Sequence, residues 1–102
     1  MRVVAELRLN QRDGVAILVG ELTFHTVPEL LTQEQMLMAG AGELLTIDLA
    51  GVVRGDSAGL ALLIAWLRTA KQHHKRVRFL NVPSQLHEMA KVSGLEGVLS
   101  LS

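Results

Sequence analysis

The sequence contains no cysteine, very few aromatic residues and no net charge. The lack of cysteine excludes disulfides, thiol catalysis and thiolate metal sites. Ten lysine and arginine residues balance ten aspartate and glutamate residues, so the chain as a whole has no attraction to nucleic acid or to an anionic membrane. The longest apolar run, residues 58–67, is far shorter than the roughly 20 residues that span a bilayer. We therefore expect a cytoplasmic protein that binds no nucleic acid and does not insert into a membrane.

The residues that are present suffice for one folded domain. A chain of 102 residues that is 49% hydrophobic can bury a single core, so we expect one domain over residues 1–102. Alternation of apolar and polar residues, apolar runs and a turn at Asp13-Gly14 predict an N-terminal hairpin and two later strands. The four predicted strands are residues 3–9, 15–20, 44–49 and 77–80.

Helical periodicity alternates with these strands. The predicted helices are residues 26–40, 57–73 and 85–92, and residues 95–102 form either a short edge strand or a last helical turn. Thr26 and Glu29 have the spacing of a capping box at the start of the first helix. This order predicts an α/β fold whose mixed β-sheet combines an N-terminal hairpin with parallel strands and is covered mainly on one face by helices.

The stretch Gly55-Asp56-Ser57-Ala58-Gly59 matches the G-x-S-x-G pattern of a serine-hydrolase nucleophile elbow. Such an elbow needs a strand that runs directly into the serine, followed along the chain by an acid and then a histidine. The predicted strand ends near Leu49, and no histidine follows either of the later acids, Glu88 and Glu96. We therefore expect no catalytic residue here and no enzymatic activity.

Neither a phosphate-binding loop nor a metal site is predicted from the sequence. Residues 51–59 contain no lysine, which a phosphate-binding loop requires. His73 and His74 are adjacent and point in different directions on a helix, so we expect neither a metal nor a cofactor. Asp56 and Ser57 are both favoured helix N-caps, and capping alone, worth about 1 kcal/mol, is the simplest role for this pair.

The helix that begins at Ser57 is apolar nearly all round. The stripe expected to face the sheet consists of Leu60, Leu63, Ile64 and Leu67. Because so small a domain should not bury a helix on both sides, Leu62 and Trp66 are predicted to be exposed anchors of a partner contact. The alternative is that the C-terminal segment folds over Trp66. The predicted partner-binding surface consists of Asp56, Ser57, Ala58, Ala61, Leu62, Ala65, Trp66, Arg68 and Thr69.

A basic segment follows this helix. No acidic residue lies between Arg68 and Arg78, whereas that interval contains five lysine or arginine residues. The segment could meet an acidic partner or lipid headgroups, or it could simply be the solvated end of a helix, where cations also suit the helix dipole. For a partner on the helix, Arg68 and Lys71 would steer its approach at the rim.

Three segments together resemble a STAS domain, the fold of bacterial anti-sigma factor antagonists and of the cytoplasmic tails of sulfate transporters. They are "LVGELTFHTVPELL" (residues 18–31), "LLTIDLAGVVRGDSAGLALLIAWLRTAKQHHKRVRFLNVP" (residues 44–83) and "LHEMAKVSGLEGVL" (residues 86–99). The resemblance covers nearly the whole chain, with its segments in the right order.

Two branches of this family imply different functions. The MlaB-type branch implies a non-catalytic accessory subunit of an ABC transporter that moves phospholipids between the inner and outer membranes. Such a subunit binds and regulates the cytoplasmic, MlaF-like ATPase subunit, and through it contacts the permease and substrate-binding subunits at the inner membrane. The antagonist branch implies a switch in which Ser57 is phosphorylated by a serine kinase that is also the anti-sigma factor. A small nucleotide- or lipid-binding module is a third interpretation.

Two departures from the antagonist pattern favour the MlaB-type branch. Antagonists usually carry a second serine or threonine after the acceptor, where this chain has Ala58, and an aspartate where it has Thr23. We therefore expect the ATPase subunit as the main partner and the anti-sigma factor as the alternative.

Overall fold

The computed structural model describes residues 4–10, 14–40 and 42–99. One mixed sheet has the strand order β1-β2-β3-β4. The strands are β1 (Ala5–Asn10), β2 (Val15–Leu22), β3 (Leu44–Gly55) and β4 (Arg76–Leu80). β1 and β2 pair antiparallel, and β2–β3 and β3–β4 pair parallel, which confirms the predicted hairpin and parallel strands. Asp13 lies outside the described residues, while Gly14 has the positive φ of a tight turn, 65°.

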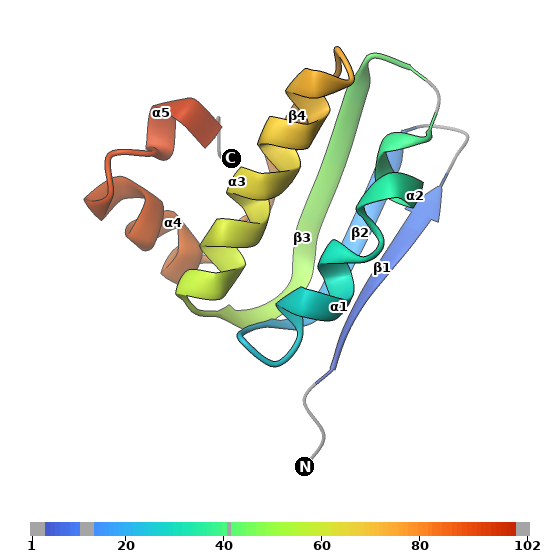
Figure 1. The fold of residues 1–102 in the computed structure, drawn as a ribbon. Coiled ribbons are helices and arrows are strands. Elements are labelled where there is room, and N and C mark those ends of the chain that lie inside the picture. The colour runs from blue at the N-terminus through green and yellow to red at the C-terminus, as the bar shows by residue number, and fades with distance from the viewer. Residues whose placement is uncertain (1–3, 11–13, 41, 100–102) are drawn as a thin grey trace.

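The helices cover one face of this sheet (Figure 1). They are α1 (Val27–Leu31), α2 (Glu34–Met38), α3 (Ser57–Gln72), α4 (Ser84–Val92) and α5 (Glu96–Leu99). α3 is the longest, and it packs against α1 and α2 on one side and against α4 and α5 on the other. The one-sided cover agrees with the prediction.

The core lies between the sheet and α3. The two faces of the sheet differ in burial, as β4 shows. Val77 and Phe79 are buried under the helices, whereas Arg76 and Arg78 alternate with them and are exposed. The fully buried side chains of the sheet include Leu18, Ile47, Leu49 and Phe79. On the opposite, uncovered face, Ile17 remains 42% exposed.

The first predicted helix is two short helices, and its predicted capping box is not formed. Thr26 occupies the N-cap position of α1 but makes no capping hydrogen bond. Its hydroxyl instead donates to the carbonyl of Glu21 at 2.5 Å and accepts from the amide of Thr23 at 3.0 Å. At the break between α1 and α2, the Thr32 hydroxyl donates to the Glu29 carbonyl, a local bond that competes with helix continuation.

The prediction that the third strand ends near Leu49 is wrong. β3 continues to Gly55, because β2 is also longer than expected and pairs with it as far as Leu22 opposite Gly55. The register shifts twice, between Asp48 and Gly51 and at Val53, and these irregularities keep the two strands paired although β3 contains two extra residues.

The described part of the C-terminal segment is helical rather than an edge strand. Gly94, with φ of 70°, ends α4 as predicted, and the described part of the remaining chain forms α5. Among the described helices, none is long and apolar enough to cross a membrane.

Candidate partner-binding site

Asp56, and not Ser57, caps α3. Asp56 is extended, with φ −112° and ψ −166°, and its carboxylate accepts from the amide of Ala58 at 2.8 Å. Its own amide donates to the carbonyl of Leu22 at 3.0 Å, which fixes the start of α3 against the end of β2. Ser57 is the first helical residue, its side chain is exposed, and within the described part of the chain its hydroxyl makes no hydrogen bond. The cap of α3 therefore does not depend on the Ser57 hydroxyl.

The two glycines of the motif allow close packing at this junction. A Cβ on Gly59 would lie 2.8 Å from the Leu22 Cβ, and one on Gly55 would lie 2.9 Å from the Leu86 Cδ2. The Gly55 amide also donates to the Gln85 side-chain oxygen at 3.0 Å, so the start of α4 supports the junction. The G-x-S-x-G match thus has a structural origin.

Two features predicted from the sequence argue against a hydrolase elbow: the strand ends too early, and no histidine follows the later acids. The structure overturns the first, and the second stands. β3 does run directly into the α3 start, with only Asp56 between Gly55 and Ser57. The chain order still lacks a histidine after Glu88 or Glu96. Of the described histidines, His87 faces Glu96 at 3.4 Å and so bridges α4 and α5.

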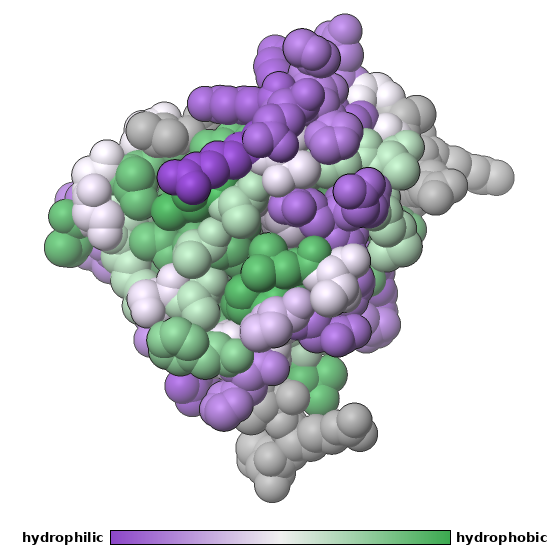
Figure 2. Space-filling view, in the orientation of Figure 1, coloured by the Kyte–Doolittle hydropathy of each residue, from purple (hydrophilic) through white to green (hydrophobic). Residues whose placement is uncertain are grey.

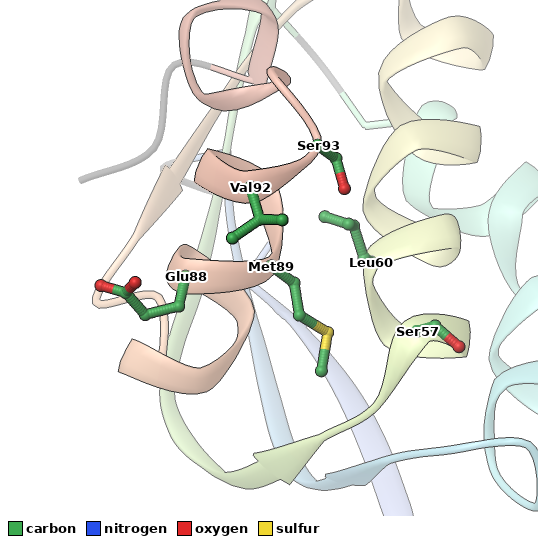
Figure 3. Close-up of a pocket in the computed structure, with 6 residues that line it drawn as sticks. All are labelled: Ser57, Leu60, Glu88, Met89, Val92 and Ser93. Atoms are coloured by element: carbon green, nitrogen blue, oxygen red, sulfur yellow. The ribbon is translucent and has the colours of Figure 1, made fainter.

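An open groove of about 340 Å³ separates the first turns of α3 from α4 (Figure 3). Its lining consists of Ser57, Leu60, Glu88, Met89, Val92 and Ser93. Val92 is 86% exposed, and Figure 3 shows the Ser57 hydroxyl pointing away from α4. Sequence reasoning missed this groove, although the spacing of Met89 and Val92 on one side of α4 was a usable signal.

The prediction that Leu62 and Trp66 are exposed anchors is wrong. Leu62 is 1% exposed and Trp66 is fully buried, so neither offers a surface to a partner. The domain buries more of α3 than expected, because α1 and α2 pack against it as well as the sheet, α4 and α5. Thr69, one turn after Trp66, donates to the carboxylate of Glu34 in α2 at 2.8 Å and ties the two helices together. Within the described residues, the Trp66 Nε1 finds no hydrogen-bond acceptor.

The outward face of α3 is correspondingly rotated from the predicted one. Ser57, Ala61 and Arg68 are exposed, and Ala58, Ala65 and Thr69 are half-buried. Ile64 and Leu67, which were predicted to face the sheet, are only partly buried. Figure 2 shows apolar residues gathered along α3 and toward α4, and hydrophilic residues gathered where α3 ends. The outward stripe therefore begins at Ser57 with small residues and ends in basic ones.

Part of the basic segment has a structural role. The Lys75 ammonium donates to the carbonyls of Gly40 at 2.7 Å and Gly42 at 2.6 Å, beyond the end of α2. Arg76 and Arg78 project from the uncovered face of the sheet. Of the five basic residues, only Arg68 and Lys71 stand exposed on α3. In the described ranges, no group of three histidine, aspartate or glutamate residues is placed to hold a metal ion.

Comparison with known proteins establishes the class to which this α/β domain belongs. A family model described as "Mlab, STAS domain" matches residues 5–101. The chain belongs to the STAS domain family, as its sequence resemblance indicated.

The relatives and solved structures most similar to this chain include anti-sigma factor antagonists. An anti-sigma-B factor antagonist from Staphylococcus epidermidis is 30% identical over 86 residues, covering 81% of this chain and 77% of that protein. The crystal structure of an anti-sigma factor antagonist from Mycobacterium paratuberculosis has a TM-score of 0.77 at 22% identity, with 96% of this chain and 85% of that chain covered. The anti-sigma factor antagonist SpoIIAA, in its unphosphorylated form, has a TM-score of 0.74 at 20% identity, with coverage of 97% and 86%.

Proposed function

We propose that this chain is an anti-sigma factor antagonist, a non-catalytic cytoplasmic regulator that binds an anti-sigma factor through the surface around Ser57. The observation that carries the proposal is the position of Ser57, exposed on the first turn of α3 and not used as the cap. Similarity to anti-sigma factor antagonists supports the kind of partner. This replaces the transporter subunit, favoured from the sequence, as the leading interpretation.

The surface suits close contact with a protein. Asp56 holds the start of α3 rigidly, so Ser57 is presented without disorder in the backbone. One turn further, Ala61 is exposed and too small to keep a partner at a distance. Arg68, two turns beyond Ala61, would lie at the far rim of such a contact and steer the approach of the partner.

The position of Ser57 also suits a phosphorylation switch. A kinase would transfer the γ-phosphoryl group of ATP to the Ser57 oxygen, with the hydroxyl proton passing to the kinase and ADP leaving. A phosphate on the first turn of a helix interacts favourably with the helix dipole, so the domain would stay folded while its binding surface gains negative charge. Binding would then be lost because the phosphate adds bulk at the interface and costs free energy to desolvate.

A second candidate is the ATPase-binding subunit of a phospholipid ABC transporter. The family-model description, which contains the name Mlab, favours it, and so do Ala58 and Thr23. Thr23 is 5% exposed and its hydroxyl accepts from the His25 amide at 3.2 Å, so no exposed carboxylate stands at that position. This candidate uses the same surface but requires no phosphate on Ser57.

The test uses the purified chain with two purified partners from the same genome, an anti-sigma factor kinase and the ABC ATPase subunit. We expect binding to the anti-sigma factor, incorporation of one phosphate at Ser57 with ATP, and loss of binding for Ser57→Asp but not for Ser57→Ala. Binding to the ATPase alone, with no phosphate on Ser57, would establish the second candidate.

A matched pair of variants then tests the surface itself. Ala61→Trp should weaken binding at least about 30-fold, because a bulky ring would stand where the partner approaches closely. Gln72→Trp adds the same ring three turns along the same helix, about 16 Å away, and should leave affinity unchanged. Equal affinity for both variants would place the interface elsewhere.

A further inference from the structure

Phe24 is exposed in a chain that buries its other aromatic residues. The sequence contains two phenylalanines, one tryptophan and no tyrosine. Phe79 and Trp66 are fully buried, whereas Phe24 is 71% exposed in the loop between β2 and α1. Aromatic side chains, phenylalanine included, are enriched at protein interfaces relative to the rest of the surface.

The turn that carries Phe24 is held rigidly from both sides. Thr23 and Thr26, which flank it, are each 5% exposed. The Thr23 carbonyl accepts from the amides of Thr26 at 3.0 Å and Val27 at 2.9 Å, and the Thr26 hydroxyl binds the backbone of both Thr23 and Glu21. The ring is therefore presented at little entropic cost to binding, as a preorganised anchor is.

This turn adjoins the start of α3. The Leu22 carbonyl, two residues before Phe24, accepts from the Asp56 amide, and Figure 1 shows the loop beside the end of β3. The charges nearby are mostly negative. Glu29 is exposed, and Glu21 and Asp56 are half-buried. The one lysine or arginine between residues 14 and 67, Arg54, is exposed and lies opposite Glu21 in the sheet, so three acids stand against one base.

We propose that Phe24 is a specificity anchor of the partner interface, and that its ring enters an apolar pocket bordered by lysine or arginine on a partner protein. This inference deepens the proposed function. It rests on one part of it, that the partner is a protein and binds at the Ser57 end. A second copy is disfavoured as occupant, because a two-fold contact through Phe24 would bring Glu21, Glu29 and Asp56 against their own copies. The same acidic residues disfavour an anionic lipid surface.

The experiment is isothermal titration of the purified partner with the wild-type chain, Phe24→Ala and Met36→Ala. Met36 is a matched control, since it is a large apolar side chain that is 48% exposed in α2 and distant in sequence from the α3 start. We expect Kd to rise at least about 30-fold for Phe24→Ala and less than about twofold for Met36→Ala. Phe24→Leu, which keeps an apolar side chain, should recover part of the affinity.

The outcomes separate this inference from the proposed function. If the wild-type chain binds neither purified partner, the proposed function fails and the inference with it. If the wild-type chain binds and Phe24→Ala binds equally well, only the inference is overturned. Dimers in light scattering, or binding to vesicles containing phosphatidylglycerol, that disappear with Phe24→Ala would also overturn it in favour of a second copy or a lipid surface. An unchanged urea midpoint for Phe24→Ala would attribute the lost affinity to the interface.

Discussion

At the scale of single residues, the residues of the segment Gly55–Gly59 have different structural roles. Gly59 lets α3 approach the end of β2, Gly55 lets α4 approach the end of β3, and Asp56 caps the helix. Ser57, between them, is exposed and forms no part of the core. Local packing therefore fixes the position of the serine, and within the described residues it does so without a hydrogen bond from the Ser57 hydroxyl.

Replacing Gly59 by alanine should destabilise the domain. The new Cβ would lie 2.8 Å from the Leu22 Cβ and 2.9 Å from the Leu22 carbonyl oxygen, so backbone must shift. We expect a loss of about 1–3 kcal/mol in the free energy of unfolding, measured by urea denaturation with Trp66 fluorescence as the probe. Gly97→Ala is the matched control, because a Cβ there would have nothing from the rest of the described chain within 4 Å and alanine favours the helix. A loss of similar size at both positions would refute the close-packing explanation for Gly59.

At the scale of elements, α3 is the scaffold of the site, and its two ends are built differently. Asp56 caps its start, whereas its end is a Schellman motif in which the Lys75 amide donates to the Ala70 carbonyl at 2.8 Å. The left-handed residue of that motif is His74, with φ of 58°, a conformation that favours glycine. α4 ends in the same motif with Gly94 in the equivalent place.

His74→Gly should therefore stabilise the domain by about 1 kcal/mol, since glycine has no Cβ to clash in the left-handed region. Urea denaturation measures this: the midpoint should rise, while the slope of the unfolding free energy against urea concentration stays unchanged. His73→Gly is the control: His73 has φ of −96°, and its ring nitrogen lies 2.9 Å from the Thr69 carbonyl, so this change should stabilise nothing. An equal gain for both variants would mean that strain at His74 is not the cause.

At the scale of the whole molecule, charge is separated along α3 although the chain has no net charge. The helix is about 24 Å long, and Asp56 caps its start. Glu21 and Arg54 are paired in register just before it, and Glu29 lies in α1, which packs against α3. Arg68 and Lys71 lie on its last turns, with Arg76 and Arg78 on the strand that follows. A partner that covers the Ser57 end should thus meet mainly negative charge there.

Reversing one charge at that end should slow association with the partner. We expect Glu29→Lys to lower the association rate constant about two- to tenfold at low salt, with the difference shrinking as ionic strength rises. Arg76→Glu reverses a charge on the uncovered sheet face and should change the rate less than twofold. Stopped-flow or surface plasmon resonance measures both, and a faster rate for Glu29→Lys would show that the partner surface is acidic.

Sequence patterns by themselves determined the order of elements and the family. Alternation in β1 and β2, the apolar run of β3 and the periodicity of α3 predicted the mixed sheet and its one-sided cover, since these patterns depend on local backbone geometry. The start of α3 at Ser57 also followed from the sequence, because cap residues and a following helical period define a helix start.

Only the tertiary structure decided which face of α3 is free. Composition could not show that α1 and α2 pack against α3 or that Leu62 and Trp66 are buried, because the direction of a short helix depends on contacts distant in sequence, such as Thr69 with Glu34. The length of β3 likewise depended on pairing with β2. Exposure of Phe24 could not be predicted either, since an aromatic residue is ordinarily expected in the core and only the hydrogen-bonded turn around Thr23 and Thr26 directs it outward.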